Sequence, residues 1–478
     1  MAEREHAPRA SPAPTDHSRR GRSDARLLRG RRRVHIVLSS LVAFAIAWTH
    51  GLAPEFVYDA AQYWGGAVAL VAGDGPVAPG GLATRGVFTA FVYLPPALLT
   101  GVLGPGVAAW AVLAWNAALA AAVSVLLLPR LAQLFTSEPA QPPVISRVWV
   151  STLLGSFVLS GFARFPLVDV WSTSLALAGF YGLAVGKRWW TLSLAGFALV
   201  VATNLRPSLL APVLLAVLIL AILRWRSVAI ALPAACLALC AQLALNVREW
   251  GLWSLTPPET GPLMAVQARW GAYALRYDTV TVDGHAPQQW YCDPAYAKLL
   301  LGDATPQNQL GVVSSAFQHM PDSIWFLFRK AAASLHWSLA TPYEYPPDNT
   351  WSWMAVLVLA IAAVGLVSLV THTWRVRQDR MALVTSLGML GFWFGALGAL
   401  VVSTPETRFA LPLVLVGLIG LVAAVPARVR LVAPSKAQIL GAAVSLLLFL
   451  ALFVAGAEAL GHNLPAGGLA DVAACAER

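Results

Sequence analysis

An acidic residue beside small neighbours is the first feature of this sequence that could carry chemistry. Within the segment Tyr58–Tyr63, helical spacing puts Asp59 and Tyr63 on one face, together with the preceding Glu55. The two alanines that follow Asp59 leave room for a ligand. A carboxylate whose pKa is raised toward neutrality in a partly buried site can accept a proton from an attacking hydroxyl. The alternative for Asp59 is an ordinary acid on a surface helix.

Two arginines lie beside short chain breaks. Arg206 falls in Asn204–Ser208, where Pro207 interrupts a helical pattern, and Arg408 falls in Thr404–Phe409. A guanidinium group presents a fixed fork of donors that suits phosphate oxygens, so two of them could hold a phosphate and stabilise it as a leaving group. The alternative for Arg408 is an ion pair with Glu406.

The composition of the chain indicates which kind of fold positions these residues. Of the 478 residues, 58% are hydrophobic and 12% are charged, against about 25% charged in soluble domains. Apolar runs reach the roughly 20 residues that cross a bilayer, and the sequence predicts an all-α integral membrane protein with about eleven spans. The predicted spans are 34–53, 107–128, 147–163, 168–186, 189–204, 207–223, 227–246, 351–371, 381–402, 408–425 and 437–456. The pair around Arg206 is either two short helices or one long broken helix.

Basic residues set the orientation. Of the 33 Lys and Arg residues, 22 fall in the N-terminal tail and in alternate short loops, which predicts a cytoplasmic N-terminus and an outer C-terminus in the plasma membrane. Residues 1–33 are predicted to be a disordered basic cytoplasmic tail. Because the basic residues do not cluster on any folded face, the net charge of +10 does not indicate nucleic-acid binding.

The remaining segments divide the chain. An N-terminal transmembrane module (34–246) contains a first outer loop (54–105) with two predicted interfacial helices, 54–71 and 93–103. A large outer loop (247–350) precedes the C-terminal transmembrane helices (351–456) and an outer tail (457–478). Phe326–Trp337 within the large loop is predicted to be interfacial.

The four cysteines lie in two kinds of segment. Cys236 and Cys240 lie inside an apolar run and are predicted to be packed helix residues. Cys292 and Cys475 both fall in segments placed outside, where a disulfide between them is allowed. The cysteines and histidines form no zinc-binding pattern.

This threading brings several ionisable residues to one depth, near the outer boundary of the membrane. Charges beside spans are costly and usually face a cavity or a partner. Snorkelling or surface charge remains the alternative for any single residue, but the set predicts one shared outer cavity. Its members are Glu55, Asp59, Arg164, Asp169, Arg206, Glu406 and Arg408.

An ordered series of short motifs resembles the GT-C superfamily of membrane glycosyltransferases. The likeness is to the protein-mannosyltransferase-like (family 39-like) branch and the lipid A aminoarabinose transferases, and it covers most of residues 34–425. The series runs through Asp59 with Tyr63, Tyr93–Pro96, Asp169, Asn204–Pro207, Asn246–Gly261, Pro321–Trp337 and Arg408–Pro412.

The resemblance implies a GT-C-like bundle that transfers a sugar from a polyprenyl-phosphate donor to an acceptor hydroxyl on the outer face, with inversion. The acceptor is a glycan, a lipid or a protein, and membrane lipids surround the enzyme. Asp59 matches the catalytic carboxylate and Asp169 the second acid, whereas Arg206 and Arg408 match the donor-phosphate contacts. Tyr63, Tyr93 and Glu406 are further candidate substrate-binding residues.

Two departures from the family pattern bear on the site. Many relatives carry adjacent acids in the first outer loop, but alanines follow Asp59, so no metal ligand is assigned and a divalent metal cofactor is doubtful. Some relatives carry a basic residue just before the Pro-Pro pair, where this chain has Leu94. Whether Arg85 substitutes for it stays open.

Two other functions are compatible with this pattern. A polymerase or ligase that uses lipid-diphosphate glycans would also need outer arginines. A transporter would place charges and broken helices near the midplane of the bilayer, often with repeat symmetry. The charges here lie at the outer edge and no repeat is evident, so the sequence favours the transferase.

Overall fold

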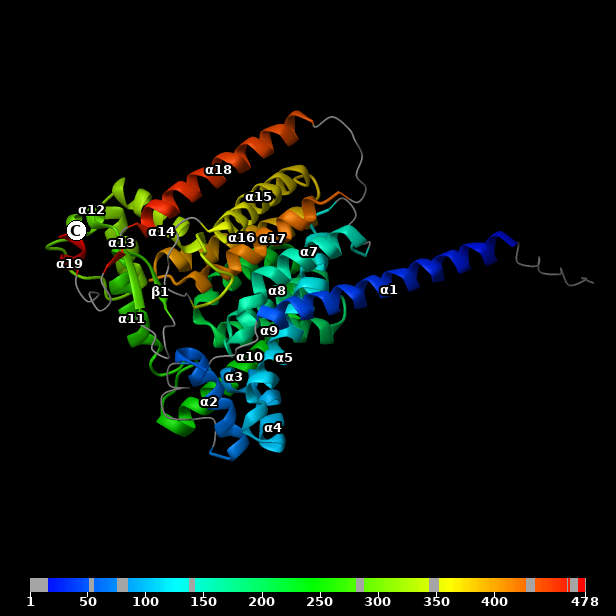
Figure 1. Ribbon diagram of the computed structural model, residues 1–478, viewed down its shortest axis with the longest axis horizontal. Coiled ribbons are helices and arrows are strands. Elements are labelled where there is room, and N and C mark those ends of the chain that lie inside the picture. The colour runs from blue at the N-terminus through cyan, green and yellow to red at the C-terminus, as the bar shows by residue number, and fades with distance from the viewer. Residues whose placement is uncertain are drawn as a thin grey trace, which may run out of the picture.

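The protein is a helical bundle with a small folded unit at one end, as the computed structural model shows (Figure 1). Eight helices in its described part are long and apolar enough to cross a membrane, so the chain is a multi-pass membrane protein of the predicted all-α class. The described residues are 16–50, 56–74, 85–136, 142–280, 288–343, 352–426, 435–461, 463–464 and 472–477.

The first helix differs from its prediction. Helix α1 spans Asp16–His50, so residues 16–33 extend the first span instead of forming a disordered tail. Arginine, leucine and alanine are good helix formers, and a membrane-length apolar helix supplies the nucleus that an isolated basic segment lacks. Figure 1 shows α1 projecting from the bundle.

The N-terminal half of the bundle follows the predicted order of spans. A continuous helical segment joins the 3₁₀ turn η1, α5, the π-helical turn η2 and α6, and further helices follow it. Their bounds are η1 Pro105–Val107, α5 Ala108–Ala122, η2 Val123–Leu127, α6 Leu128–Gln133, α7 Ile145–Leu159, η3 Ser160–Arg164, α8 Asp169–Val185, α9 Trp189–Leu205, η4 Pro207–Leu209 and α10 Leu210–Trp250.

Helix α10 consists of two limbs that fold back on each other. Arg224, between the limbs, leaves helical geometry with φ −116° and ψ 28°. Its guanidinium donates to the carbonyls of Ala184 (2.5 Å) and Gly186 (2.6 Å), which satisfies the open C-terminal end of α8. Gln242 near the end of the second limb bonds Asn204 just before the start of the first. The chain around Arg206 therefore joins two separate helices, α9 and α10, which is the first of the two alternatives that the sequence left open.

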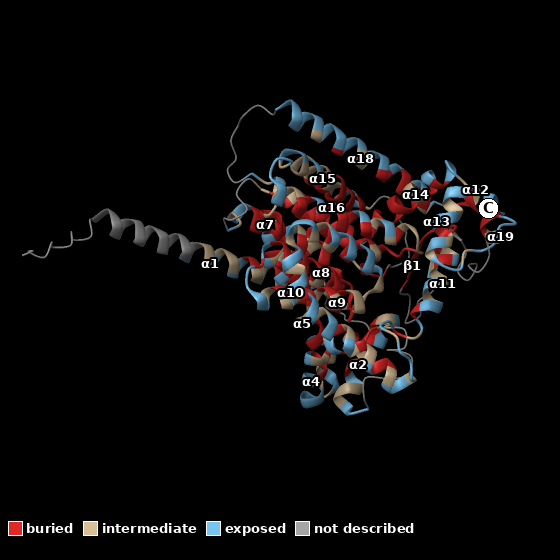
Figure 2. Cartoon of the chain, turned by 180° about the vertical axis from the view of Figure 1, so that it is seen from behind, coloured by how far each residue is buried: buried red, intermediate tan, exposed pale blue. Residues whose placement is uncertain are grey.

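Four helices complete the bundle. They are α15 (Trp353–Arg375), α16 (Arg380–Val401), α17 (Leu411–Ala424, preceded by the 3₁₀ turn η5, Thr407–Ala410) and α18 (Lys436–Leu460). Helix α17 is buried on nearly all sides, whereas α18 lies on the outside of the bundle with one face exposed (Figure 2). Helices that are apolar all round, as α17 is, occupy the core of a large bundle.

Three short helices form the described part of the first outer region. They are α2 (Tyr58–Ala72), α3 (Phe88–Val92) and α4 (Leu94–Leu103), and both predicted helices of this region are present. Tyr58 at the start of α2 has a φ of 48°, which an L-residue adopts at a cost of about 1–2 kcal/mol. Glu55 and most of the Gly/Pro-rich turn after α2 lie outside the described residues.

The large loop and the C-terminal tail form one folded unit at an end of the bundle rather than two separate segments, and this unit is called the outer unit after its predicted side. A three-stranded antiparallel sheet of order β1-β2-β3 takes two strands from the loop and the third from the tail. Cys292 and Cys475 form the disulfide that the sequence allowed. The elements are α11 Thr260–Gly271, β1 Ala274–Thr279, β2 Gln288–Cys292, α12 Pro294–Leu299, α13 Gln309–Gln318, α14 Asp322–Leu335, β3 Asn463–Leu464 and α19 Val472–Ala476.

Helix α14 has a buried polar face that its sequence did not predict. Its basic residues are buried inside the protein, where Arg329 pairs with Asp293 at 2.7 Å and Lys330 donates to the Gly271 carbonyl at 2.5 Å. The amphipathic pattern that predicts a membrane-surface helix serves equally well for a helix between a bundle and a polar unit. Helix α14 therefore joins the outer unit to α18.

Candidate active site

A cavity of about 700 Å³ lies where the outer unit meets the bundle. Three groups of residues line it. The first is a charged cluster of five side chains that come from five places in the sequence: Asp59, Arg85, Asp169, Arg206 and Arg408. An apolar wall is formed by Leu205, Leu210, Ala211, Gly395, Gly398, Ala399 and Val402, and an outer arm by Thr260, Gln267, Trp270, Thr279, Gln288 and Gln309.

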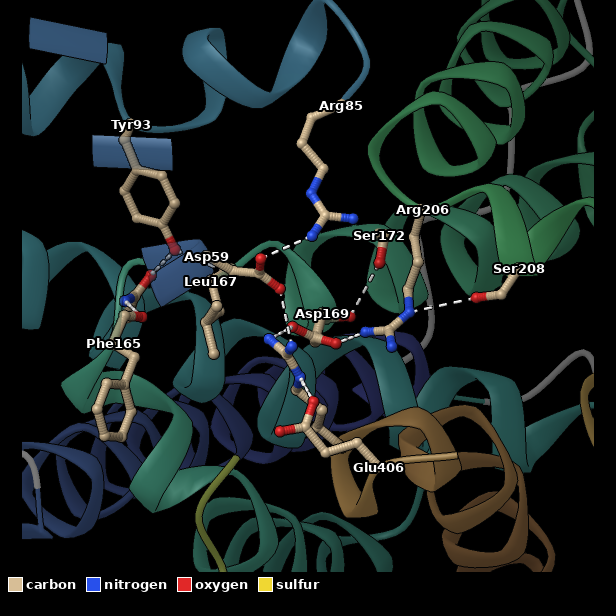
Figure 3. A network of polar contacts seen from close by, with 12 residues as sticks. Asp59, Arg85, Tyr93, Phe165, Leu167, Asp169, Ser172, Arg206, Ser208 and Glu406 are labelled. Carbon is tan, nitrogen blue, oxygen red and sulfur yellow. Dashed lines mark hydrogen bonds and ion pairs between the residues drawn. The ribbon is translucent and has the colours of Figure 1, made fainter. Parts of the chain in front are cut away.

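Asp59 lies between two guanidinium groups (Figure 3). Its Oδ1 accepts a hydrogen bond from Arg85 at 2.6 Å and its Oδ2 accepts one from Arg408 at 2.8 Å. The carboxylate is in the first turn of α2, where the helix dipole also favours a negative charge. The left-handed Tyr58 directly precedes it, so local strain occurs next to the candidate catalytic group.

The charge state of Asp59 differs from the sequence expectation. Burial alone raises the pKa of Asp59, but the charges and hydrogen bonds of Arg85 and Arg408 outweigh burial and hold that pKa well below its ordinary value. The expectation of a pKa near neutrality is therefore wrong for this state of the protein. Asp59 is ionised and can accept a proton, although it is a weak base while both arginines bind it.

Arg85 is the member of the cluster that sequence reasoning left open. A chain of buried amides positions it: the backbone N–H of Val87 donates to Gln242 at 2.8 Å, and that of Phe88 donates to Asn204 at 3.1 Å. The intervening Gly86 lies so close to Asn204 that an added Cβ would come within 2.1 Å of its Oδ1. Polar residues within apolar helices were the signal that could have identified this anchor.

The second acid and the two predicted arginines are in contact. Asp169, at the start of α8, pairs with Arg206, and its other oxygen lies 3.8 Å from Arg408. The guanidinium of Arg206 lies over the ring of Phe409 at 4.3 Å and donates to Ser208 at 3.2 Å. The structure thus brings together the two acids and the two arginines that the resemblance assigns to the site, namely Asp59, Asp169, Arg206 and Arg408.

The outer unit fixes the segment that carries Arg408. The N–H of Tyr277 in β1 donates to the Pro405 carbonyl at 2.9 Å, and the Thr404 N–H donates to Gln267 in α11 at 3.1 Å. Glu406, fully buried behind the cluster, accepts from Arg408 at 2.5 Å. Arg408 therefore makes the ion pair with Glu406 that was considered as the alternative to phosphate binding, and it also pairs with Asp59.

Two predicted binding residues do not line the cavity. Tyr93 is fully buried, and its hydroxyl donates to the Leu167 carbonyl at 2.7 Å and contacts Asn116 (Figure 3), so it positions the turn before Asp169. Glu406 is shielded by Arg408. Tyr63 does line the cavity, beneath the guanidinium of Arg85 at 5.7 Å. Arg164 lines a separate cavity of about 180 Å³.

Carboxylates and guanidinium groups alternate across this site. Within the described residues, no group of three or more His, Cys, Asp or Glu side chains is placed to hold a metal ion, and the carboxylates of Asp59 and Asp169 face guanidinium groups. The cluster with Glu406 has three acids and three arginines, so it is formally neutral.

Comparisons with protein-family models, with curated proteins and with solved structures give no match to this chain.

Proposed function

We propose that the protein is a GT-C-type glycosyltransferase that moves a sugar from a polyprenyl-phosphate donor to an acceptor hydroxyl on the outer face of the membrane. The observation that carries this proposal is the convergence of Asp59, Asp169 and three arginines in one cavity that also has an apolar wall. A lipid phosphate needs both surfaces: guanidinium groups for its head and apolar helices for its chain.

In the proposed complex, the donor phosphate takes the place of a carboxylate among the arginines. The phosphate oxygens accept hydrogen bonds from Arg85, Arg206 and Arg408, and the polyprenyl chain lies along the apolar wall. Sharing Arg85 and Arg408 with the phosphate weakens their hold on Asp59, and the pKa of Asp59 rises from its depressed value. Donor binding would thus convert a weak base into a stronger one.

The transfer step then follows from the positions of these groups. Asp59 accepts the proton of the acceptor hydroxyl, and the acceptor oxygen attacks the anomeric carbon on the face opposite the phosphate. The bond between the anomeric carbon and the phosphate oxygen breaks, and the arginines stabilise the leaving polyprenyl phosphate. One displacement gives inversion. Because polyprenyl phosphate leaves readily without being protonated, one base suffices where glycosidases need a pair of carboxyl groups.

The proposed function sets a topology. Helices α8 and α9 and the two limbs of α10 each cross the membrane, which brings the total to about eleven crossings. The N-terminus is in the cytoplasm, and the outer unit faces the outside of the plasma membrane, as the loop charges favour. The outer unit then covers the acceptor and excludes water from the reaction.

The decisive experiment is transfer by the purified protein in lipid nanodiscs, with polyprenyl-phosphate sugars extracted from the source membranes. Wild-type protein should consume the donor and form a glycosylated acceptor, and Asp59→Asn should reduce the rate by about 10²–10⁴-fold. Asp74→Asn removes an exposed acid near the other end of α2 and should leave the rate unchanged. Full transfer by Asp59→Asn would refute the mechanism.

A further inference from the structure

The described residues of the outer arm of the cavity carry no charge. Among the described residues that line the cavity, the charged side chains all belong to the cluster around Asp59, whereas the outer unit supplies amides, hydroxyls and aromatic rings. The charged residues of β1 that lie nearest, Arg276 and Asp278, are fully buried and pair with each other at 2.6 Å. Among the described residues, a ligand group in the outer arm therefore meets hydrogen-bonding groups without a counter-charge.

Several of these cavity-lining groups keep hydrogen-bonding capacity that no described residue takes up. The Gln267 oxygen accepts from the Thr404 N–H, which leaves its NH₂ group to donate. The Gln309 NH₂ donates to the Met264 carbonyl at 3.1 Å, which leaves its oxygen to accept. The two amides together offer a donor and an acceptor, as hydroxylated ligands require.

Two buried hydroxyls at the same cavity have no partner among the described residues. Thr260 is 7% exposed and Tyr343 is 1% exposed, and neither side-chain oxygen makes a hydrogen bond within the described part of the chain. Leaving a buried polar group without a partner costs about 1–3 kcal/mol. Such groups indicate a site built for a polar ligand.

We infer that the transferred group is an uncharged sugar, bound in the outer arm through its hydroxyls by Gln267, Gln309 and Thr260 and packed against Trp270. This inference rests on the proposed function and specifies its substrate class. An amino sugar or a uronic acid would place an ionised group beside neutral amides, and an unpaired charge that loses its water is strongly disfavoured. Neutral amides and an indole ring recognise a hydroxylated ring without that penalty.

Binding to the full-length protein in nanodiscs tests this inference. The probes are prenyl phosphates of one chain length that carry no sugar, glucose, glucosamine or glucuronic acid. The glucosyl probe should bind at least tenfold more tightly than either charged probe, and more tightly than the bare prenyl phosphate. Gln267→Glu adds a charge of nearly the same shape, so it should shift the ratio of affinities toward the glucosamine probe by at least tenfold.

The matched control is Gln318→Glu, an exposed position of the same outer unit away from the cavity, which should keep the wild-type ratio. Equal or tighter binding of a charged probe by the wild-type protein would overturn the inference and leave the proposed function intact. Equal binding of all sugars and of bare prenyl phosphate would show that the outer arm does not contact the sugar. Failure of bare prenyl phosphate to bind would overturn the proposed function itself.

Discussion

The Asp59 carboxylate forms ion pairs with Arg85 and Arg408, and it is also the proposed catalytic base. The same guanidinium groups that depress its pKa are those assigned to the donor phosphate. The carboxylate and the phosphate therefore compete for Arg85 and Arg408. This competition distinguishes a catalytic Asp59 from a merely structural one, because the two roles predict opposite effects on phosphate binding.

Removing the charge of Asp59 should strengthen the binding of a prenyl phosphate, although it slows transfer. Asp59→Asn changes the formally neutral cluster to a net positive one, so a prenyl phosphate without sugar should bind about tenfold more tightly, a gain of roughly 1.4 kcal/mol. The measurement is titration of the nanodisc protein at low and high salt, since screening should reduce the gain. Asp74→Asn should bind as wild type does, and weaker binding by Asp59→Asn would show that its role is to hold the arginines in place.

Arg85 lies outside the helices, but side chains from two helices determine its position. Asn204 on α9 and Gln242 on α10 hold the backbone that follows Arg85, and Asn246 extends the same chain of amides to the Ser254 and Thr256 carbonyls at 2.7 and 2.8 Å. The start of the large loop and the Arg85 segment thus share one anchor. Displacement of this anchor should affect both the phosphate and the outer unit.

A methyl group at Gly86 tests the anchor without touching the charged cluster. Gly86→Ala must push the Arg85 segment away from Asn204, because the new Cβ has no room. We expect a prenyl phosphate to bind about tenfold more weakly, as it should to Arg85→Gln. Gly65→Ala on α2 is the control, since an added Cβ there meets nothing within 4 Å. Wild-type affinity in Gly86→Ala would mean that Arg85 reaches the phosphate from a mobile segment.

The contact between α14 and α18 should depend on pH. His336 follows α14 and lies against Gly456 of α18; burial, with a smaller contribution from Arg276, lowers the pKa of His336 to about 4. The unfolded chain, with an ordinary pKa near 6.5, binds the proton more readily, so stability is full above about pH 6.5 and falls as the pH drops toward 4. The melting temperature of wild type should fall across that range, and that of His336→Leu should fall less. An unchanged slope would assign the acid sensitivity to other groups.

Much of the whole molecule was predictable from the sequence, because the bilayer imposes length and polarity on each span. The order of the helices and the grouping of Asp59, Asp169, Arg206 and Arg408 follow from that constraint. The break at Arg206 was indicated by Pro207, which did not decide between two short helices and one broken helix. Contacts between loops that are far apart in the sequence could not be predicted. Arg85, the burial of Tyr93 and the third strand from the tail each require knowledge of which loops meet, and no local pattern specifies that.

The disulfide allows the orientation of the whole chain to be tested without an activity assay. Cys292 and Cys475 are 183 residues apart, and their bond forms only where both lie on the oxidising side of the membrane. A protease site inserted at 376–379, between α15 and α16, therefore cuts the chain within the loop that the bond closes. After cleavage and denaturation in membranes blocked with a thiol reagent, the two fragments should migrate together without reductant and separate with it.

Two variants make this result specific. Cys475→Ser should release the fragments without reductant, whereas Cys236→Ser should not, because Cys236 is a free thiol on α10. The protease should reach the inserted site only from the cytoplasmic side, since the proposed topology places 376–379 there. Linked fragments combined with cytoplasmic cleavage require that the outer unit and the α15–α16 loop lie on opposite sides of the membrane. Separation of the wild-type fragments without reductant would place the two cysteines in a reducing compartment and would move the charged cavity to the cytoplasmic side, where an acceptor on the outer surface could not reach Asp59.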